Sequence, residues 1–423
     1  MSLPLRTINI LVFPCGSEIA LEVYNSLSPQ KNLKIFGASS VDDNGKFVFE
    51  NYIDGVPMVN AENFIDFMKD VIKENNIDAI YPCMDVVITK LKKHESELGC
   101  KILSSPIETV EIASRKSLTY EHFQNLIRTP RIIDTKNPEF PLFSKPDIGA
   151  SSRNTLKVEN ELDLQYAIKK YPTNLLLEYL PGDEYTIDCF TDRHGKLLFV
   201  GPRKRARISN GISVGVKSVI DERINEIAKV INDSLTFNGA WFFQLKKDKN
   251  EEYCLLEIAA RFGGSSVINR ISGVNFAYLT LLNAYGDVSV FKNDYDVEVG
   301  RSLDIKTITN LDYQKVYLDF DDTLIVSGTV NLDAIQFVYK CLNKGIEVIL
   351  LTKHQKPIYE TLKTYRIDSS VFSKIIQIER KDDKYKYIDP KKSIFIDDSF
   401  KELMDVRKHL NIPVISVENI KHI

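Results

Sequence analysis

The stretch that most limits the possible fold is residues 239–266, GAWFFQLKKDKNEEYCLLEIAARFGGSS. Aromatic and branched residues at 241–245 and 253–258 flank a charged turn, a pattern typical of a β-hairpin. An amide, Gln244, lies in the first apolar run and a carboxylate, Glu257, in the second. Burying either without a partner costs several kcal/mol, about 2–7 for an amide. We therefore expect a cation or a cationic side chain between them.

Arg261 and the turn Gly263–Ser266 follow this hairpin directly. Small residues in such a turn let backbone N–H groups approach an anion closely. Metal ligands, an arginine and an amide-rich turn together indicate a site for a nucleoside triphosphate. A half-buried hairpin with incidental polar residues is the alternative that this stretch alone leaves open.

Length and composition limit the class of protein. With 423 residues the chain has room for about two to four domains. The formal net charge of −3 gives no reason to expect nucleic acid or an anionic membrane as a partner, so we expect small-molecule partners, and a homo-oligomer stays possible. Six cysteines without a C-x-x-C pair are typical of reduced, buried thiols in a cytoplasmic protein. There is no signal peptide pattern and no apolar run near ~18 residues, so no membrane span is expected.

Residues 1–112 alternate apolar strands with amphipathic helices. Strands are expected at 9–15, 33–38 and 79–82, and helices at 18–27 and 61–74. This alternation predicts a Rossmann-like domain with a doubly wound parallel sheet. The turn Gly16-Ser17 lacks the G-x-G-x-x-G fingerprint, so no dinucleotide is expected.

Residues 113–305 change to a mixed, antiparallel α+β pattern. One strand ends in Lys145 and runs into a loop of small residues that contains Ser151 and Ser152. Small residues let the backbone approach a ligand, so this loop is expected to form a flap over phosphates. As a generic hairpin loop the same residues would be unremarkable.

Two further segments of this region carry polar groups on strands. A strand ending at 178–180 could offer its backbone to the edge of an adenine, and Glu184 could accept hydrogen bonds from two ribose hydroxyls. Arg205 and Arg207 lie on a strand that ought to alternate. They suit charge stabilisation of a phosphoryl group in transfer or, alternatively, a solvated sheet edge.

Residues from about 7 to 305 carry these motifs in an order that resembles the ATP-grasp superfamily, in the branch of the carbamoyl phosphate synthase large subunit and related carboxylate–amine ligases. The resemblance implies a Rossmann-like pre-ATP-grasp domain at 1–112 and an ATP-grasp domain at 113–305, with ATP and Mg²⁺ as cofactors. The nucleotide contacts that it implies are Lys116, Lys145, Ser151, Ser152, Glu178, Tyr179, Leu180 and Glu184. The implied magnesium ligands are Gln244 and Glu257, and the implied catalytic cations are Arg205, Arg207 and Arg261. One position departs from the family pattern E-x-N, because Ala259 stands where the family has a further metal ligand.

The residue types agree with one chemistry. A carboxylate is a poor electrophile, and transfer of the γ-phosphoryl group of ATP to it makes a mixed anhydride that an amine can attack. Such a reaction needs cations and amides around phosphate and a lid against water. The sequence therefore predicts an ADP-forming ligase that joins a small-molecule carboxylate to an amine. An ATP-binding regulatory module is the alternative.

A second region, residues 313–423, begins with a buried strand that ends in the sequence DFDDT at 319–323. Two of its acids, Asp319 and Asp321, lie beside each other at the carboxyl end of a parallel strand and would repel strongly without a cation. Later apolar strands end in Thr352 and in Asp397-Asp398, with lysines between them.

These strand ends resemble the haloacid dehalogenase (HAD) superfamily of aspartyl-nucleophile phosphotransferases. By this resemblance Asp319 would be the nucleophile, Asp321 the general acid and base, and Thr352 a ligand of the phosphoryl group. Lys384 would neutralise the phosphoryl group, with Lys386 or Lys381 as alternatives. The implied magnesium ligands are Asp319, Asp321, Asp397 and Asp398.

The expected fold class is thus α/β and α+β multidomain, with a capless HAD-like doubly wound parallel sheet after the ATP-grasp domain. Only 33 residues (352 − 319) separate the first two motifs, which leaves room for one helix and no cap domain. Either the substrate is large, or the ligase half covers the pocket. A bifunctional enzyme that also hydrolyses a phosphomonoester is therefore predicted, and a non-catalytic structural module is the alternative.

Overall fold

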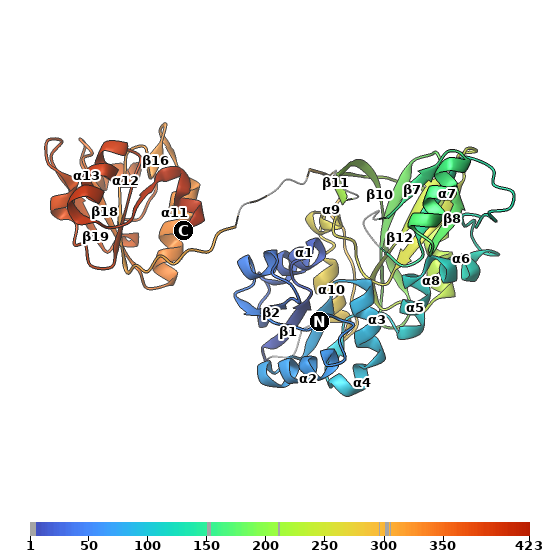
Figure 1. Cartoon of the computed structure of the whole chain (residues 1–423). Helices are drawn as coiled ribbons and strands as arrows, with labels where there is room; N and C mark the ends of the chain where they lie inside the picture. The colour runs from blue at the N-terminus through green and yellow to red at the C-terminus, as the bar shows by residue number, and fades with distance from the viewer. Residues whose placement is uncertain (1–5, 150–153, 210–211, 296, 301–303, 305) are drawn as a thin grey trace. The chain divides into compact units, whose positions relative to one another are not determined.

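The computed structural model describes residues 6–149, 154–209, 212–295, 297–300, 304 and 306–423, without the side chains of 205–209, 212–214 and 216. The chain divides into two compact units, Met1–Leu303 and Asp304–Ile423 (Figure 1). The expected boundary between residues 112 and 113 lies inside the first unit and stays a prediction. Within the described residues no helix has the length and apolarity that crossing a membrane requires.

The first unit begins with a parallel five-stranded sheet in the order β3-β2-β1-β4-β5. Its strands are β1 (Ile8–Phe13), β2 (Leu33–Ala38), β3 (Asn51–Ile53), β4 (Ala79–Pro82) and β5 (Lys101–Ile102). The accompanying helices are α1 (Glu18–Leu27), η1 (Asn44–Phe47), α2 (Phe64–Asn75), α3 (Asp85–Lys93) and α4 (Glu95–Leu98). Side chains of β1 alternate between two cores, one shared with α1 and the other with α2 and α3. The sheet is therefore covered on both faces.

A six-stranded antiparallel sheet in the order β13-β12-β9-β10-β11-β14 forms the centre of the same unit. Its strands are β9 (Glu184–Thr191), β10 (Leu197–Ser209), β11 (Ile212–Ser218), β12 (Gly239–Lys247), β13 (Tyr253–Ala259) and β14 (Glu298–Gly300). The helices around it are α5 (Ile107–Ser114), α6 (Lys116–Phe123), α8 (Glu222–Ser234), α9 (Val267–Ile271) and α10 (Phe276–Asn283).

Alternation along β12 explains how this sheet is packed. Ala240 belongs to the core that α10 shares with β1, whereas Trp241 and Phe243 belong to a core with α5 and α8. The first core contains residues of both sheets, so the two sheets of the first unit are held together by shared apolar packing.

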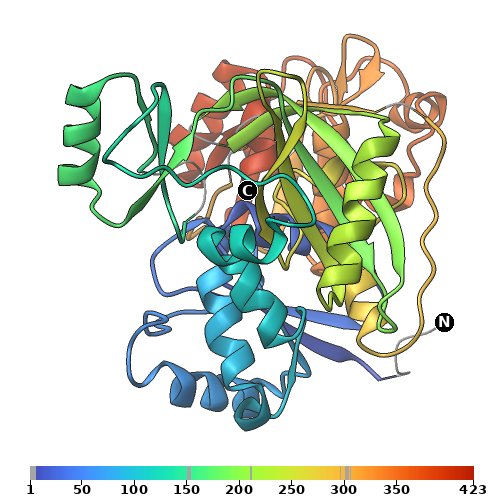
Figure 2. The same ribbon diagram turned by 90° about the vertical axis from the view of Figure 1, so that its right-hand side faces the viewer.

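A smaller antiparallel sheet in the order β7-β6-β8 projects to one side of the six-stranded sheet (Figure 2). It consists of β6 (Leu142–Pro146), β7 (Leu156–Val158) and β8 (Asn174–Glu178), and α7 (Glu161–Lys170) covers it. The loop after β6 and the end of β8 both carry residues expected to contact a nucleotide.

The second unit has a five-stranded parallel sheet in the order β19-β18-β15-β20-β21. The strands of this unit are β15 (Lys315–Leu318), β16 (Ile325–Val326), β17 (Thr329–Val330), β18 (Glu347–Thr352), β19 (Lys374–Gln377), β20 (Ser393–Asp397) and β21 (Val414–Ser416). Its helices are α11 (Leu332–Asn343), α12 (Ile358–Thr364), η2 (Ser369–Val371), η3 (Lys384–Tyr387), α13 (Phe400–Leu410) and η4 (Val417–His422).

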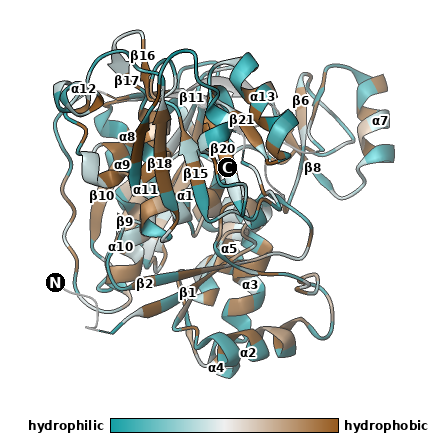
Figure 3. Ribbon diagram, turned by 90° about the vertical axis from the view of Figure 1, so that its left-hand side faces the viewer, coloured by the Kyte–Doolittle hydropathy of each residue, from teal (hydrophilic) through white to brown (hydrophobic). Residues whose placement is uncertain are grey.

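Both faces of this sheet are apolar, and β18 is largely hydrophobic along its length (Figure 3). One core joins it to α11 and α12, and a second core on the opposite face joins it to α13. Strand order reverses between β15 and β20, so the carboxyl ends of these two strands form a crevice of the kind in which ligands bind. Between β15 and β18 the described chain contains only the hairpin β16–β17 and the helix α11.

Two candidate active sites

The first candidate site is organised around Glu257 on β13. Gln244 on β12 lies directly opposite it in the antiparallel register, so the two side chains are on the same face of the sheet. Glu257 Oε2 lies 3.4 Å from Lys145 Nζ and 3.8 Å from Lys116 Nζ. Burial alone would raise the pKa of Glu257, but Lys145, Lys116 and Arg261 together hold it below its usual value. The carboxylate is therefore ionised at neutral pH.

Lys116 fixes the beginning of the loop after β6. Its Nζ donates to the carbonyl oxygens of Asp147, at 3.4 Å, and Gly149, at 3.3 Å. The carboxylate of Asp147 accepts in turn from the backbone N–H and hydroxyl of Ser117, at 2.8 and 3.0 Å. Burial lowers the pKa of Lys116. Ser151 and Ser152, the expected phosphate contacts in the rest of this loop, lie outside the described residues.

The expected adenine region is at the end of β8. The Glu178 carboxylate is paired with Arg128, at 3.0 Å, and with Arg131, at 3.4 Å. Burial opposes ionisation of Glu178, but the Arg131 N–H and the Arg128 guanidinium outweigh it and hold its pKa below the usual value. Because the Glu178 carboxylate is engaged in these contacts, the backbone of this residue is better suited than its side chain to meet a base.

The neighbouring expected nucleotide contacts have different surroundings. The Tyr179 ring has Lys157 Nζ 4.9 Å from its centroid, and Leu180 is buried. Glu184 is the first residue of β9 and faces Lys246 of β12 in the register. The ribose and base contacts assigned to these residues stay predictions.

Arg205 and Arg207 lie on β10, opposite Val216 and Gly215 of β11, and their side chains lie outside the description. Among the arginines of β10, the one whose side chain the structure describes is Arg203, which was not among the expected site residues. It is buried and pairs with the buried carboxylate of Asp188 through contacts of 2.7 and 3.2 Å.

This buried pair reaches the glycine-rich turn. Arg203 Nη1 donates to the Ser265 hydroxyl at 2.8 Å, and Asn269 Nδ2 donates to Asp188 at 2.9 Å. A Cβ atom at Gly263 would lie 2.9 Å from Arg203 Nη2, so a larger residue there would require the guanidinium to shift. The signal that could have found the pair is a carboxylate in the apolar strand EYTIDCFT, which needs a buried cation.

Arg261, the other expected catalytic cation, lies directly after β13. It pairs with Asp85, the first residue of α3, through contacts of 2.9 and 2.7 Å. Asp85 was not among the expected site residues, because no local pattern connects it to Arg261.

The second candidate site lies in the carboxyl-terminal unit. Lys384 Nζ donates to Asp319 and to Asp397 at 2.6 Å each, and all three side chains are buried. Burial raises the pKa of both carboxyl groups, and the shared lysine opposes the rise. Of the alternative lysines, Lys381 pairs with Glu379 and Lys386 with Asp383, both with largely exposed side chains.

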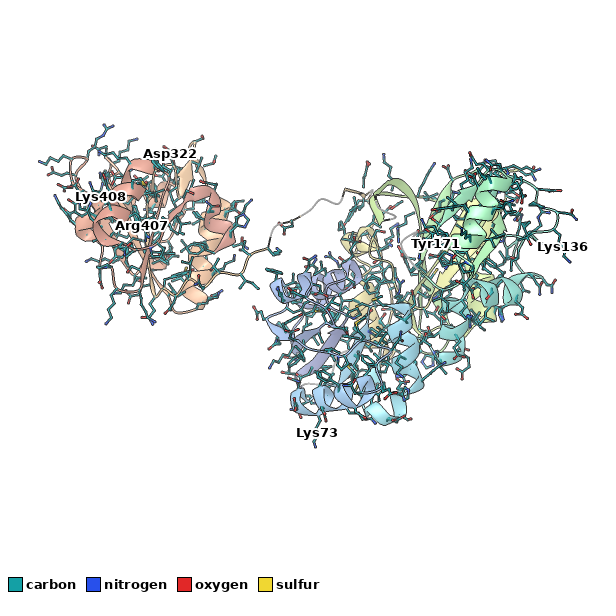
Figure 4. All side chains as sticks on the ribbon, viewed as in Figure 1. Lys73, Lys136, Tyr171, Asp322, Arg407 and Lys408 are labelled. Carbon is teal, nitrogen blue, oxygen red and sulfur yellow. The ribbon has the colours of Figure 1, made fainter. Side chains whose placement is uncertain are left out.

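The donor set of this site suits a hard divalent cation. Carboxylate oxygens of Asp319, Asp397 and Asp398 all lie within 4.8 Å of one another, and oxygen ligands are those that Mg²⁺ prefers. Asp321, expected as a fourth ligand, is absent from this group among the described residues. Thr352 is fully buried at the end of β18. Asp322, the residue after Asp321, lies at the surface of the unit (Figure 4).

Comparison with known proteins gives a match for part of the chain. Residues 170–311 match the family described as ATP-grasp in the biosynthetic pathway with Ter operon. No curated protein sequence matches the chain.

Solved structures are similar to a larger part of the chain than residues 170–311. A biotin carboxylase from Campylobacter jejuni gives a TM-score of 0.57 at 18% identity, covering 68% of this chain and 73% of its own. An L-amino acid ligase from Bacillus licheniformis gives 0.55 at 20% identity, with coverages of 68% and 76%. N5-carboxyaminoimidazole synthetase from Staphylococcus aureus, complexed with ADP, gives 0.56 at 16% identity, with coverages of 68% and 80%. Together with the match over 170–311, this likeness shows that the chain has the ATP-grasp fold.

Proposed function

We propose that the amino-terminal unit is an ATP-dependent ligase that joins a carboxylate to an amine. The observation that carries the proposal is the grouping of Glu257 with Gln244, Lys145 and Lys116, which come from four separate elements. A carboxylate and an amide beside two ammonium groups can hold both a magnesium ion and the phosphates of ATP.

The reaction has two steps. A carboxylate oxygen attacks the γ-phosphorus of ATP and ADP leaves, which gives an acyl phosphate. The amine then attacks the acyl carbon, phosphate leaves, and the amine nitrogen loses a proton to give the amide. Lys145 and Lys116 would neutralise the phosphates, Arg261 would steady the transferred group, and Arg205 and Arg207 would stabilise charge during transfer. Magnesium, held by Gln244 and Glu257, would polarise the γ-phosphoryl group.

The names of the similar structures support this chemistry. Two of them are an amino acid ligase and a carboxyaminoimidazole synthetase complexed with ADP. Ala259 stands where the family pattern has a further metal ligand, so in this proposal magnesium would be held by Glu257 and Gln244 without that third ligand.

The test is release of ADP from MgATP by the full-length protein with mixtures of carboxylates and amines. We expect ADP release that requires both substrates and that Glu257→Ala or Lys145→Ala abolishes. Glu251→Gln, in the exposed turn of the same hairpin, is the matched control and should keep the activity. Nucleotide binding without any substrate-dependent turnover would favour the regulatory module.

We propose in addition that the carboxyl-terminal unit hydrolyses a phosphomonoester. The specific observation is Lys384 between the buried acids Asp319 and Asp397 at the crevice of a parallel sheet. Asp319 would attack phosphorus while Asp321 gives its proton to the leaving oxygen. Water, losing a proton to Asp321, would then cleave the aspartyl phosphate. Asp319→Asn should abolish hydrolysis of p-nitrophenyl phosphate while ligation stays measurable, whereas unchanged hydrolysis would favour a structural module.

The two activities are proposed to act in sequence. Tethering raises the effective concentration of an intermediate to roughly millimolar for a short linker. An amine that carries a phosphate ester, such as an amino-alcohol phosphate, would be coupled first and dephosphorylated afterwards. With the same substrates, Asp319→Asn should accumulate a phosphorylated amide that mass spectrometry detects and that the wild type removes. Identical unphosphorylated products from the wild type and Asp319→Asn would contradict the proposed order of coupling followed by dephosphorylation.

A further inference from the structure

Asp321 has a partner that neither the sequence nor the comparisons assign, His354. The Nδ1 atom of His354 lies 2.9 Å from one carboxylate oxygen of Asp321 and 3.0 Å from the other. A contact to both oxygens restricts rotation of the carboxyl group as well as its position. The Asp321 side chain is 53% exposed and the His354 side chain only 15%, so the histidine lies behind an acid that faces solvent.

The backbone and the ring of His354 are both fixed by further contacts. Its backbone N–H donates to Thr352 Oγ1 at 3.0 Å, and its carbonyl oxygen accepts from Gln377 Nε2 at 2.7 Å. Its second ring nitrogen, Nε2, lies 3.1 Å from the hydroxyl oxygen of Thr361, and its ring packs edge-on against Phe320, with 5.1 Å between centroids. An exposed aspartate alone would sample several rotamers, whereas these contacts favour the rotamer that keeps both carboxylate oxygens beside His354 Nδ1.

The neighbours of His354 connect it to the reacting groups. Thr352, which binds its backbone, is the expected phosphoryl ligand, and Phe320 lies between Asp319 and Asp321 in the chain. His354 therefore contacts both Asp321 and Thr352, and through them it connects the general acid with the expected phosphoryl-binding residue.

We propose that His354 is a positioning residue that holds the Asp321 carboxyl group for proton transfer to the leaving oxygen, and that the site therefore takes phosphomonoesters of alcohols. The inference rests on the proposed phosphatase function. In the step concerned, the bond between phosphorus and the ester oxygen breaks as Asp319 bonds to phosphorus. The proton of Asp321 moves to that oxygen, and an alcohol leaves.

The chemistry of the leaving group makes this testable. An alkoxide needs a proton as it leaves, whereas p-nitrophenolate leaves readily without one. General acid catalysis contributes about 10²–10⁴-fold for groups that need it. If His354 only positions the acid, its loss should slow the hydrolysis of alkyl phosphates selectively. If His354 only supports the fold, its loss should slow the hydrolysis of both classes of ester alike.

The experiment compares kcat/KM for glycerol 2-phosphate and for p-nitrophenyl phosphate in the full-length protein, because kcat/KM reports the steps up to departure of the alcohol and leaves out cleavage of the aspartyl phosphate, which is common to both esters. We expect His354→Ala to lower kcat/KM for glycerol 2-phosphate by at least about tenfold while kcat/KM for p-nitrophenyl phosphate stays within about threefold. His354→Asn, whose amide N–H can replace Nδ1–H, should restore part of the loss. Thr361→Val, which removes the contact at Nε2, should show a weaker form of the same selectivity.

Two controls define the outcome. Gln355→Ala, an exposed neighbour whose side chain reaches only the Lys353 carbonyl among the described contacts, should leave both rates unchanged. In an Asp321→Asn background, His354→Ala should cause no further loss, because the acid that it positions is gone. Equal losses on both esters, or no loss on either, would overturn the inference while the phosphatase function stands. A wild type inactive on both esters would overturn the phosphatase function and this inference with it.

Discussion

Asp85 and Arg261 form a two-point ion pair between segments 176 residues apart in the sequence, with contacts of 2.9 and 2.7 Å. Asp85 begins α3 beside the parallel sheet, and Arg261 follows the strand that carries Glu257. Burial alone would lower the pKa of Arg261, but Asp85 and Glu257 raise it. The helix layer of the parallel sheet thus orients an arginine of the proposed ligase site.

Loss of this pair should slow ligation. We expect Asp85→Asn to reduce kcat for ADP release by about tenfold, because misplacement of a group that stabilises transferring phosphate costs rate. The affinity for ATP, measured by calorimetry, should change much less than kcat, since among the described residues Asp85 hydrogen-bonds to Arg261 and reaches the nucleotide residue Lys116 only through its charge. Asp66→Asn, on the exposed face of α2, is the control. An unchanged kcat would show that ligation does not depend on orientation of Arg261 by Asp85.

The buried pair Asp188–Arg203 should matter for stability. Asp188→Ala leaves a buried guanidinium without its counter-charge, and we expect a loss of about 3–5 kcal/mol in the free energy of unfolding. Replacing both residues with Leu and Met should cost much less. Urea unfolding followed by tryptophan fluorescence is a suitable measurement, because Trp241 is the single tryptophan and is fully buried in this unit. A double variant as unstable as Asp188→Ala would contradict the reasoning.

The three candidate lysines of the second unit should behave differently. Lys384→Met should abolish hydrolysis of p-nitrophenyl phosphate, because it removes the cation that separates Asp319 from Asp397. Lys381→Met and Lys386→Met should keep the wild-type rate, since these side chains pair at the surface. Loss of activity in either of the latter would reassign the phosphoryl-binding lysine.

The thiols should be unreactive in the folded protein. Burial raises the pKa of Cys15, Cys100 and Cys254 to about 12 and that of Cys341 to about 11. Cys83 and Cys189 are fully buried and shifted in the same direction. A raised thiol pKa means less thiolate at pH 8, so a disulfide reagent such as DTNB should modify the native protein slowly and all six cysteines after denaturation. Because Cys100 is only partly buried, rapid modification of more than one thiol in the native protein would contradict the burial of the other five.

The sequence was most informative where polar residues interrupt apolar strands. Alternation along β12 and β13 already suggests that Gln244 and Glu257 share a face, and the ends of parallel strands suggest that Asp319 and Asp397 lie close together. The structure brings these residues together, and it brings Lys145 and Lys116 to Glu257.

The residues missed in the sequence share one property. Asp85, Arg203 and His354 act through partners on other elements, and no periodicity specifies which distant side chain an acid or a base will meet. The short helix η3 likewise places Lys384, rather than a neighbouring lysine, between two acids. Local patterns predict which side chains are buried or exposed, whereas pairing depends on how whole elements pack.

The central claim is the formation of an acyl phosphate in the amino-terminal unit, and isotope transfer tests it most directly. A carboxylate that supports ADP release is prepared with ¹⁸O in both oxygens and supplied with MgATP and the amine. Attack of one carboxylate oxygen on the γ-phosphorus predicts inorganic phosphate that carries one ¹⁸O atom, which mass spectrometry detects, and Glu257→Ala should release none. Unlabelled phosphate alongside amide formation would contradict the account, because the carboxylate oxygen would then never have been bonded to phosphorus.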